Sequence, residues 1–481
     1  MKKQPNILWI CSDQQRFDTL GAYGNTRVST PNIDRLANEG ALFTNAFCQN
    51  PTCAPSRASF LTGRYPRTCR QRQNGSDIPD TEVLVTKMLQ DEGYYNGLSG
   101  KLHIRGARPQ RGESRIDDGY NEFHWSHHTG NPKEGPNQYQ QWLKEKGVTY
   151  ETRPCDESRF IRFGLSEENH QTAWCSQKAM RFMRDRALDE QPWLFSVNIF
   201  DPHHPFDAPE EYVKKYLDTL EQIPLPAYQQ GELETKTEFQ RIDHKGAYGG
   251  HGMSPVKMSE LDHRLVKASY WAMCELVDTY VGKMLDVLDA TGQRENTMVI
   301  YTSDHGEMLG DHGIYWKGAY FYDCAIKVPL ILNMPGAIGP QTVNELVELL
   351  DLPSTILDLA QVREHPGMQG KSLMPLLRGE RPDTHHRQDI YCESYSDPVG
   401  ATKTPNTQSQ LTTMVRTEKF KLTVAHGHNW GELYDLEKDP LEFNNLWDNE
   451  AYKDTKIEML LRLSDRMALT IDPLPSRPVA W

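Results

Sequence analysis

The chain has 481 residues, which is too long for one ordinary hydrophobic core and therefore predicts one large domain and a smaller one. Hydrophobic residues make up 37% of the sequence and aromatic residues 10%, which is typical of a packed globular protein and excludes a disordered chain. The formal net charge of -13 argues against non-specific binding to nucleic acid or to an anionic membrane, so an anionic ligand would need a local cluster of cations.

The N-terminal segment is polar up to Asn6 and continues directly into an apolar run, Ile7 to Ser12. That run is too short for the apolar part of a secretory signal, and no cleavage pattern of small residues follows it. No stretch of about 18 apolar residues occurs, so no membrane span is predicted. We therefore expect a cytoplasmic protein, or a periplasmic one if a signal has been removed.

Short apolar runs rich in β-forming residues alternate with helical patterns over the first two thirds of the chain. This alternation predicts an α/β fold in which helices sandwich a large, mostly parallel sheet. In chain order, we expect strands at residues 7–11, 95–99, 193–200, 297–302 and 328–333. Helices are expected from Pro31 to Gly40 with Thr30 as the N-cap, over residues 82–92, and over residues 261–290.

The sequence pattern changes near residue 380, after which short alternating runs predict a small antiparallel sheet and a helical pattern predicts a terminal helix. These segments are residues 389–393, 411–416 and 420–424 for the strands and residues 452–467 for the helix. We therefore predict an α/β domain over residues 1–380 and a C-terminal α+β subdomain over residues 381–481.

Three of the predicted strands are followed directly by polar residues. Asp13 follows the first strand, residues 201–204 follow the strand that ends at Phe200, and residues 303–305 follow a later strand. Open α/β sheets place their sites at the carboxyl ends of their strands. We therefore expect these three segments to converge, although they are far apart in the sequence.

The nine cysteines are scattered and form no C-x-x-C pair, so neither a zinc knuckle nor a disulfide framework is predicted. Eight of them are interpreted as buried or half-buried thiols. Cys53 differs because it opens the segment Cys-Ala-Pro-Ser-Arg-Ala-Ser-Phe-Leu-Thr-Gly-Arg, which ends at Arg64. The alternative interpretation of this segment is a helix start that carries an inert thiol.

The segment Cys53 to Arg64 resembles the signature of the type I, formylglycine-dependent sulfatases of the alkaline phosphatase superfamily. That signature is C-x-P-S-R, followed by three residues and L-T-G-R. Six further segments match the family in order, so the resemblance covers nearly the whole chain. It implies a catalytic domain over residues 1–380 and the hydrolysis of a sulfate ester.

The resemblance also implies how Cys53 would act. In this family a maturation enzyme oxidises the cysteine to formylglycine, and the aldehyde hydrates to a gem-diol. One diol oxygen binds a metal and becomes the nucleophile, and the other lets the covalent sulfate hemiacetal collapse by elimination. Pro55 suits the first turn of a helix, whose N-terminus favours an oxyanion, and Arg57 one turn later could reach the same anion.

A metal site is implied at two strand ends, where Asp13-Gln14 and Asp304-His305 match the family's ligand segments and would bind one cation together with residue 53. Carboxylate and amide oxygens suit a hard divalent cation, Ca²⁺ first and Mg²⁺ second. The family usually has a second acidic residue in place of Gln14 and often an asparagine in place of His305, and both departures occur in branches of the family.

Four more residues match the family's sulfate pocket. Lys101 and His103 lie in a G-K-x-H segment, where the lysine would bind sulfate and the histidine would act as the base of the elimination. His203 lies in a P-H-x-P segment and is preferred to the adjacent His204. Lys317 matches the second sulfate-binding lysine, and Lys317 or His203 would protonate the leaving alcohol.

Two alternatives to a sulfatase remain open. One is a phosphonate monoester or phosphodiester hydrolase of the same superfamily, although those enzymes lack the lysine and histidine found here as Lys101 and His103. The other is a non-catalytic glycan-binding relative in which Cys53 is never oxidised. The complete set of metal and pocket residues argues against the second alternative.

The substrate is expected to be a sulfated sugar, with a uronic-acid-containing oligosaccharide as the favoured example. The region from Arg105 to Arg162 has weak periodicity and is predicted to be a long excursion over the sheet edge, where binding residues tend to lie. Its arginines suit carboxylates or sulfates, and its aromatic residues suit sugar rings. The residues in question are Arg105, Arg108, Arg111, Arg115, Trp125, His127 and His128.

Overall fold

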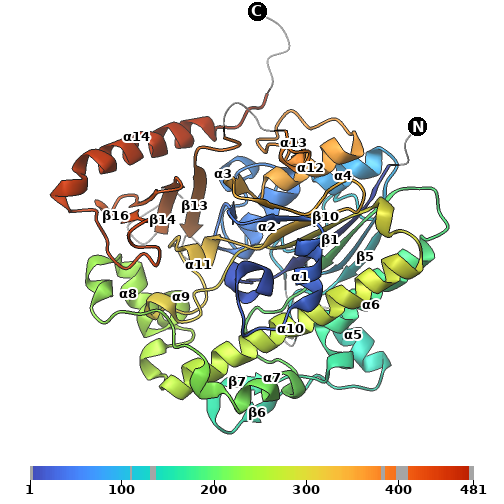
Figure 1. Cartoon of the computed structure of the whole chain (residues 1–481), viewed down its shortest axis with the longest axis horizontal. Coiled ribbons are helices and arrows are strands. Elements are labelled where there is room, and N and C mark those ends of the chain that lie inside the picture. The colour runs from blue at the N-terminus through green and yellow to red at the C-terminus, as the bar shows by residue number, and fades with distance from the viewer. Residues whose placement is uncertain (1–3, 109–110, 130–136, 381–384, 397–409, 476–481) are drawn as a thin grey trace, which may run out of the picture.

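The computed structural model describes residues 4–108, 111–129, 137–380, 385–396 and 410–475. A large sheet crosses the molecule with helices on both of its faces, and a smaller sheet with the long terminal helix lies at one side (Figure 1). This arrangement confirms the predicted α/β fold. No helix among the described residues is both long and apolar enough to cross a membrane.

The large sheet has eight strands, and most neighbouring pairs run parallel. In spatial order they are β11 (Gln341–Val343), β2 (Ala41–Phe43), β10 (Leu330–Asn333), β9 (Thr297–Ser303), β1 (Asn6–Ser12), β8 (Trp193–Asn198), β4 (Tyr95–Gly100) and β5 (Glu122–Trp125). Strand β10 is antiparallel to both of its neighbours. Because β1 lies between β8 and β9 and is parallel to both, the carboxyl ends of these three strands share one edge.

The side chains of β1 show how the sheet is covered on both faces. Ile7 and Trp9 pack in one hydrophobic cluster, whereas Leu8 and Ile10 pack in another, as the two-residue period of a strand requires. Helices α1 (Pro31–Asn38), α6 (Gln171–Asp185) and α10 (Glu260–Ala290) cover the Leu8 face, and α2 (Cys53–Thr62), α4 (Val85–Asp91) and α12 (Asp351–Ala360) cover the other.

Two predicted segments differ from the structure in detail. Helix α4 begins at Val85 rather than at Glu82, because Leu84 has an extended backbone conformation and acts as the N-cap; the Glu82 carboxylate forms ion pairs with Arg64 and Arg70. The region expected to be an irregular excursion contains α5 (Gln138–Glu145), the hairpin of β6 (Arg153–Cys155) and β7 (Ser158–Phe163), and the edge strand β5. Strand β5 has only four residues, which are too few for an alternating pattern to be recognised in the sequence.

The C-terminal part forms the predicted antiparallel sheet with a helix. Its elements are β13 (Ile390–Ser396), β14 (Gln410–Arg416), β15 (Phe420–Ala425), β16 (Trp430–Asp435) and α14 (Lys453–Leu469). Helix α14 packs its Met459 and Leu463 against this sheet, in a cluster that also contains Tyr65 and Leu350 of the large domain. The two parts therefore share buried contacts. The domain boundary at residue 380 remains a prediction, and residues 381–384 lie outside the described part of the chain.

Arg387 fastens the start of the C-terminal part to the large domain. Its guanidinium binds Glu348 at 3.0 Å and Asp351 at 2.9 Å, and all three side chains are almost completely buried. Substitution Arg387→Met leaves two buried carboxylates without their main counter-charge, so we expect a loss of about 3–5 kcal/mol of stability, measured from the denaturant midpoint. The control Arg378→Met removes a half-exposed, 3.6 Å contact with Asp358 and should cost less than about 1 kcal/mol. Equal losses would contradict this prediction.

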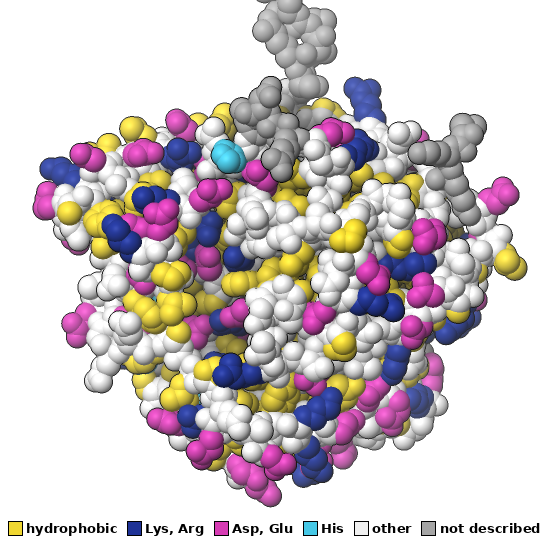
Figure 2. Space-filling view, viewed as in Figure 1, with side chains coloured by type: hydrophobic (Ala, Val, Ile, Leu, Met, Phe, Trp, Pro, Cys, Tyr) yellow, Lys and Arg dark blue, Asp and Glu magenta, His cyan; other side chains and the backbone are white. Residues whose placement is uncertain are grey.

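The surface carries no large area of one charge on the face shown in Figure 2, where acidic and basic side chains alternate. The expectation that neither nucleic acid nor an anionic membrane is a partner stays a prediction.

Candidate active site

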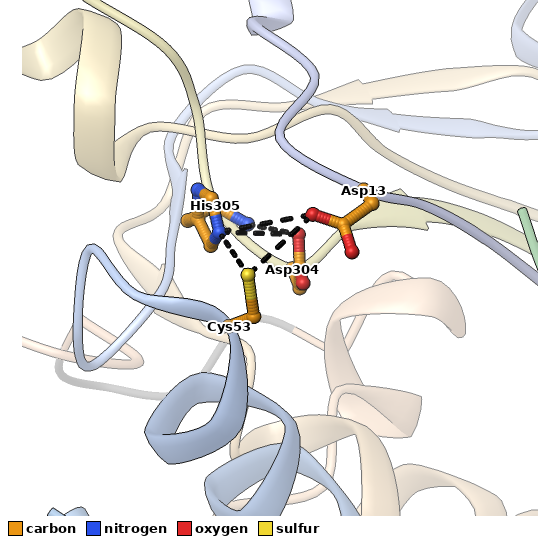
Figure 3. A group of neighbouring side chains, drawn as sticks. All are labelled: Asp13, Cys53, Asp304 and His305. Carbon is orange, nitrogen blue, oxygen red and sulfur yellow. Dashed lines mark hydrogen bonds and ion pairs between the residues drawn. The ribbon is translucent and has the colours of Figure 1, made fainter. Parts of the chain in front are cut away.

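Four side chains converge at the shared carboxyl edge of β1 and β9. Asp13 directly follows β1, Asp304 and His305 directly follow β9, and Cys53 is the first residue of α2 (Figure 3). Their potential ligand atoms all lie within 4.8 Å of one another, and all four residues are buried. The structure thus brings together the residues of two strand ends and of the cysteine motif.

Cationic groups surround the sulfur of Cys53. The Sγ atom lies 3.0 Å from Nζ of Lys317, 3.5 Å from Nζ of Lys101 and 3.2 Å from Nε2 of His305. Burial and the Asp13 carboxylate act to raise the pKa of the Cys53 thiol, but the two lysines and His305 outweigh them and hold it well below its usual value. Cys53 also opens a helix, whose N-terminus favours negative charge. Position 53 is therefore built to stabilise an anion.

Arg57 holds the carboxylates of the site in place. Its Nε donates to Asp304 at 2.8 Å, its Nη2 lies 3.3 Å from Asp13, and its Nη1 donates to the carbonyl oxygen of Lys101 at 2.7 Å. Although burial acts in the opposite direction, the positive charges of Lys101 and Arg57 keep the pKa of Asp13 well below its usual range. Arg57 thus fixes both carboxylates and the Lys101 segment, and its reach to the anion at residue 53 remains a prediction.

The donor set fits a divalent cation. His305 Nδ1 lies 2.8 Å from the carbonyl oxygen of Gly306, which makes it the donor, so Nε2, which lies 3.2 Å from the Cys53 sulfur, is the nitrogen that would bind a cation. Asp13 and Asp304 supply carboxylate oxygens, and Gln14 is tied to the cluster by its backbone N–H, which donates to Asp304 at 2.9 Å. Mainly oxygen ligands with one imidazole suit Ca²⁺ or Mg²⁺ better than a soft metal.

His103 lies beside the cluster with an unused ring nitrogen. Its Nδ1 is buried and has no hydrogen-bond partner among the described residues, and its ring centre lies 4.3 Å from that of His127. Burial, His127 and Lys101 lower its pKa well below the usual value, so the imidazole is neutral near pH 7. A neutral imidazole with a free nitrogen can accept a proton.

The two adjacent histidines occupy different positions. His204 lies 3.4 Å from Nε2 of Gln14 and stacks on Trp316, with ring centres 4.0 Å apart. His203 packs against Phe200, and its Nδ1 lies 2.6 Å from the carbonyl oxygen of His204. Burial and the nearby charge of Lys317 lower the pKa of both rings well below the usual value. Both therefore lie near Lys317, and the preference for His203 remains a prediction.

Comparison with known proteins agrees with this geometry. The family model described as "Sulfatase" matches residues 5–362, and the model "N-sulphoglucosamine sulphohydrolase, C-terminal" matches residues 310–468. The first match spans more than half of the chain. The chain belongs to the sulfatase family. It is accordingly a sulfuric ester hydrolase, as the cysteine motif predicted.

Two related sequences and one solved structure show how similar the chain is to known proteins. The chain is 30% identical to the uncharacterized sulfatase YidJ of Escherichia coli over 98% of this chain and 89% of that protein. It is 27% identical to iduronate 2-sulfatase of Mus musculus over 93% of this chain and 91% of that protein. The structure of a phosphonate monoester hydrolase from Silicibacter pomeroyi superposes with a TM-score of 0.85 and 24% identity, over 98% of this chain and 97% of that one. The last comparison bears on the fold alone.

The arginines that the sequence offered to a sulfated sugar are largely engaged within the sulfatase itself. Arg105 pairs with Asp80, Arg108 with Asp77 at 2.5 Å, and Arg115 with Asp118 at 2.5 Å. These pairs hold the 105–118 segment to its neighbours and reduce the positive charge available to a substrate. The partners could not be recognised from the sequence, because two of them lie 25 and 31 residues away.

Two acids of the sulfatase site, the half-buried Glu113 and the buried Glu307, were missed by sequence reasoning. Glu113 accepts the backbone N–H groups of His103 and Ile104 at 2.9 and 2.7 Å and so fixes the turn after Lys101. Glu307 accepts a hydrogen bond from Gln14. Glu307 lies only three residues after Asp304, and this closeness to a strand end was the signal available in the sequence.

Removal of divalent cations should abolish the sulfatase activity. Chelation is expected to stop turnover, and Ca²⁺ or Mg²⁺ should restore it, because the cluster of Asp13, Asp304 and His305 has the donors for one such ion. At a concentration about 100 times its Kd, the cation should also add about 2.7 kcal/mol of stability, visible as a rise in Tm. Two zinc ions in anomalous diffraction would contradict the proposed single site.

Proposed function

We propose that this sulfatase removes sulfate from a sulfated carbohydrate, with a formylglycine derived from Cys53 as its nucleophile. The observation that carries the proposal is the position of Cys53 at a helix N-terminus, within 3.0–3.5 Å of two buried lysines and a histidine and beside two carboxylates. An unmodified cysteine does not require this environment. The Cys53 sulfur stands where a formylglycine oxygen would lie.

The cationic side chains supply the charge placement that a sulfate monoester needs. Hydrated formylglycine at position 53 would provide the attacking oxygen, and a cation held by Asp13, Gln14, Asp304 and His305 would lower the pKa of that oxygen. The Nζ atoms of Lys101 and Lys317 both contact the sulfur of Cys53, at 3.5 and 3.0 Å. They would therefore flank the oxygens of the sulfate while it is transferred to residue 53. Arg57 fixes the positions of the two carboxylates and of the Lys101 backbone relative to one another.

Two proton transfers complete the reaction. The leaving alcohol would take a proton from Lys317 as its bond to sulfur breaks, because burial and the charge of Lys317 lower the pKa of His203 and leave that ring neutral. His103, which is neutral and has a free buried nitrogen, removes the proton from the second oxygen of residue 53, so that sulfate leaves and the aldehyde is restored.

The proposed substrate is a sulfated sugar that contains a uronic acid. The relative named iduronate 2-sulfatase, which is similar over nearly the whole length of both chains, supports this choice. Rings suitable for a sugar face lie around the site: His127 lies beside His103 and in turn contacts Trp125, and Trp316 and Tyr248 lie beside His204. Release of sulfate from a set of defined sulfated oligosaccharides tests this choice, and activity on aryl sulfates only would overturn it.

We infer that a maturation enzyme must act before the chain folds. All ten residues of α2, including Cys53, are buried, so the motif is accessible only in an unfolded chain. We further propose that folding and maturation take place in the cytoplasm. Oxidation of Cys53 should therefore require co-expression with the maturation system and should fail on folded protein.

The second candidate is a phosphonate monoester hydrolase, because the structure from Silicibacter pomeroyi shares the fold. Lys101 and His103 favour the sulfatase. The test is kcat/KM on an aryl sulfate and on an aryl phosphonate monoester with the same leaving group. We expect the sulfate to be preferred, and a preference for the phosphonate would overturn the proposal.

A further inference from the structure

Glu307 is a completely buried carboxylate directly behind the cluster. One of its oxygens accepts the backbone N–H groups of Leu309 and Trp316, at 2.8 and 2.5 Å, and the other accepts the side-chain NH₂ of Gln14. All three partners are donors, and they match the acceptor-only character of a carboxylate. Glu307 therefore joins the residue after Asp13 to the residue before Lys317.

These contacts decide which way the Gln14 amide faces. The backbone of Gln14 is fixed at both ends, because its N–H donates to Asp304 at 2.9 Å and its carbonyl oxygen accepts from Tyr270 at 2.6 Å. With the NH₂ group held by Glu307, the amide oxygen must point the opposite way, where it accepts from Nζ of Lys317. A cation ligand at position 14 must present this oxygen rather than the NH₂ group.

We propose that Glu307 is a positioning residue: it does not bind the cation itself, but through its contact with Gln14 it supplies the negative charge that the Gln14 side chain lacks. It orients the Gln14 oxygen toward the cation site and, through the backbone of Trp316, holds Lys317 against residue 53. The inference rests on the metal site of the proposed function. It predicts that Gln14 and Glu307 act as a matched amide–carboxylate pair.

The substitution Glu307→Gln isolates this role. The new amide keeps an oxygen for the two backbone N–H groups but turns an NH₂ group toward the NH₂ of Gln14. The Gln14 amide must then flip and direct a donor at the cation. We expect Ca²⁺ affinity to fall by about 10–100-fold, the range for a lost partner of a ligand. Isothermal titration of Ca²⁺ into protein with unmodified Cys53 measures this without turnover.

The double variant Glu307→Gln with Gln14→Glu restores an amide–carboxylate pair, with the carboxylate now at position 14 and the amide at position 307. A carboxylate at position 14 can accept from the amide introduced at position 307 and still present an oxygen to the cation, so affinity should return to within about tenfold of the original. A recovery larger than the change that Gln14→Glu makes alone separates this pairing from a general gain of negative charge at the cation site. Failure of the double variant to recover Ca²⁺ binding overturns the inference, as does Glu307→Gln with unchanged affinity.

Glu432 provides the matched control. It too is buried and accepts the side-chain NH₂ of a glutamine, Gln240, at 2.6 Å, but it lies in the C-terminal sheet. Glu432→Gln creates the same conflict between donors and should lower Tm while leaving Ca²⁺ affinity unchanged. A wild-type protein made with the maturation system, and carrying formylglycine at residue 53, that binds Ca²⁺ but releases no sulfate would overturn the proposed function and leave the Glu307 inference standing. A wild-type protein that binds neither Ca²⁺ nor Mg²⁺ would overturn both.

Discussion

The substitution Cys53→Ala is expected to lower kcat for release of sulfate from an aryl sulfate by a factor on the order of 10⁴–10⁶, as loss of a covalent nucleophile does. The fold should persist, because alanine fits a position whose neighbours are polar and whose helix starts at the same residue. Steady-state rates at saturating substrate and cation, with the Tm of each protein, measure both effects.

The control for Cys53 is another buried thiol. Cys155→Ala removes a sulfur that lies in the β6–β7 hairpin, outside the cluster, and 3.1 Å from a carboxylate oxygen of Glu157. This variant should leave kcat unchanged. Wild-type sulfate release by Cys53→Ala would show that residue 53 is not the nucleophile.

Lys101→Ala should impair the steps up to and including sulfate transfer. Its ammonium group is buried, lies 2.5 Å from Asp13 and 3.5 Å from Cys53, and would flank the transferred sulfate. We expect kcat/KM to fall by about 10²–10⁴-fold, the range for a positioned catalytic group. Lys267→Ala is the matched control, because Lys267 is also buried but donates to the carbonyl oxygen of Pro224, outside the cluster. Equal losses in the two variants would contradict the assigned role.

His103→Ala should instead impair release of the sulfate. A burst of alcohol should appear, and sulfate should remain on the residue-53 peptide while kcat falls by about 10²–10⁴-fold. Because burial, His127 and Lys101 lower the pKa of His103, its base form persists as pH falls through the usual histidine range near 6.5, so release should stay fast there. A release step that already fails near pH 6.5 in the wild type would contradict this assignment.

The sequence was sufficient for the main elements because their patterns are local. The buried runs of β1, β8 and β9 and the helical period of α10 are visible without knowledge of their neighbours. The polar residues at the ends of these strands predicted a shared edge, and the order β9-β1-β8 provides it. The short edge strand β5 was missed because its four residues carry no clear period.

The site contacts that the sequence did not reveal are contacts between segments far apart in the chain. Glu307 could be recognised as a partner of Gln14 only once β1 and β9 were known to be neighbours. The sequence alone leaves Arg105 and Arg108 available to a substrate, whereas in the structure they form ion pairs with Asp80 and Asp77. The motifs identified the residues of the site. The partners that each side chain contacts follow from tertiary packing, which no local sequence pattern encodes.

The most direct test of the formylglycine hypothesis is the mass of the peptide that contains residue 53, measured on active protein made with the maturation system. We predict the aldehyde or its hydrate in place of the thiol, in a fraction that rises in proportion to the specific activity, and an intact thiol in inactive protein made without that system. Full sulfatase activity from protein whose residue 53 is entirely an unmodified cysteine would contradict the account.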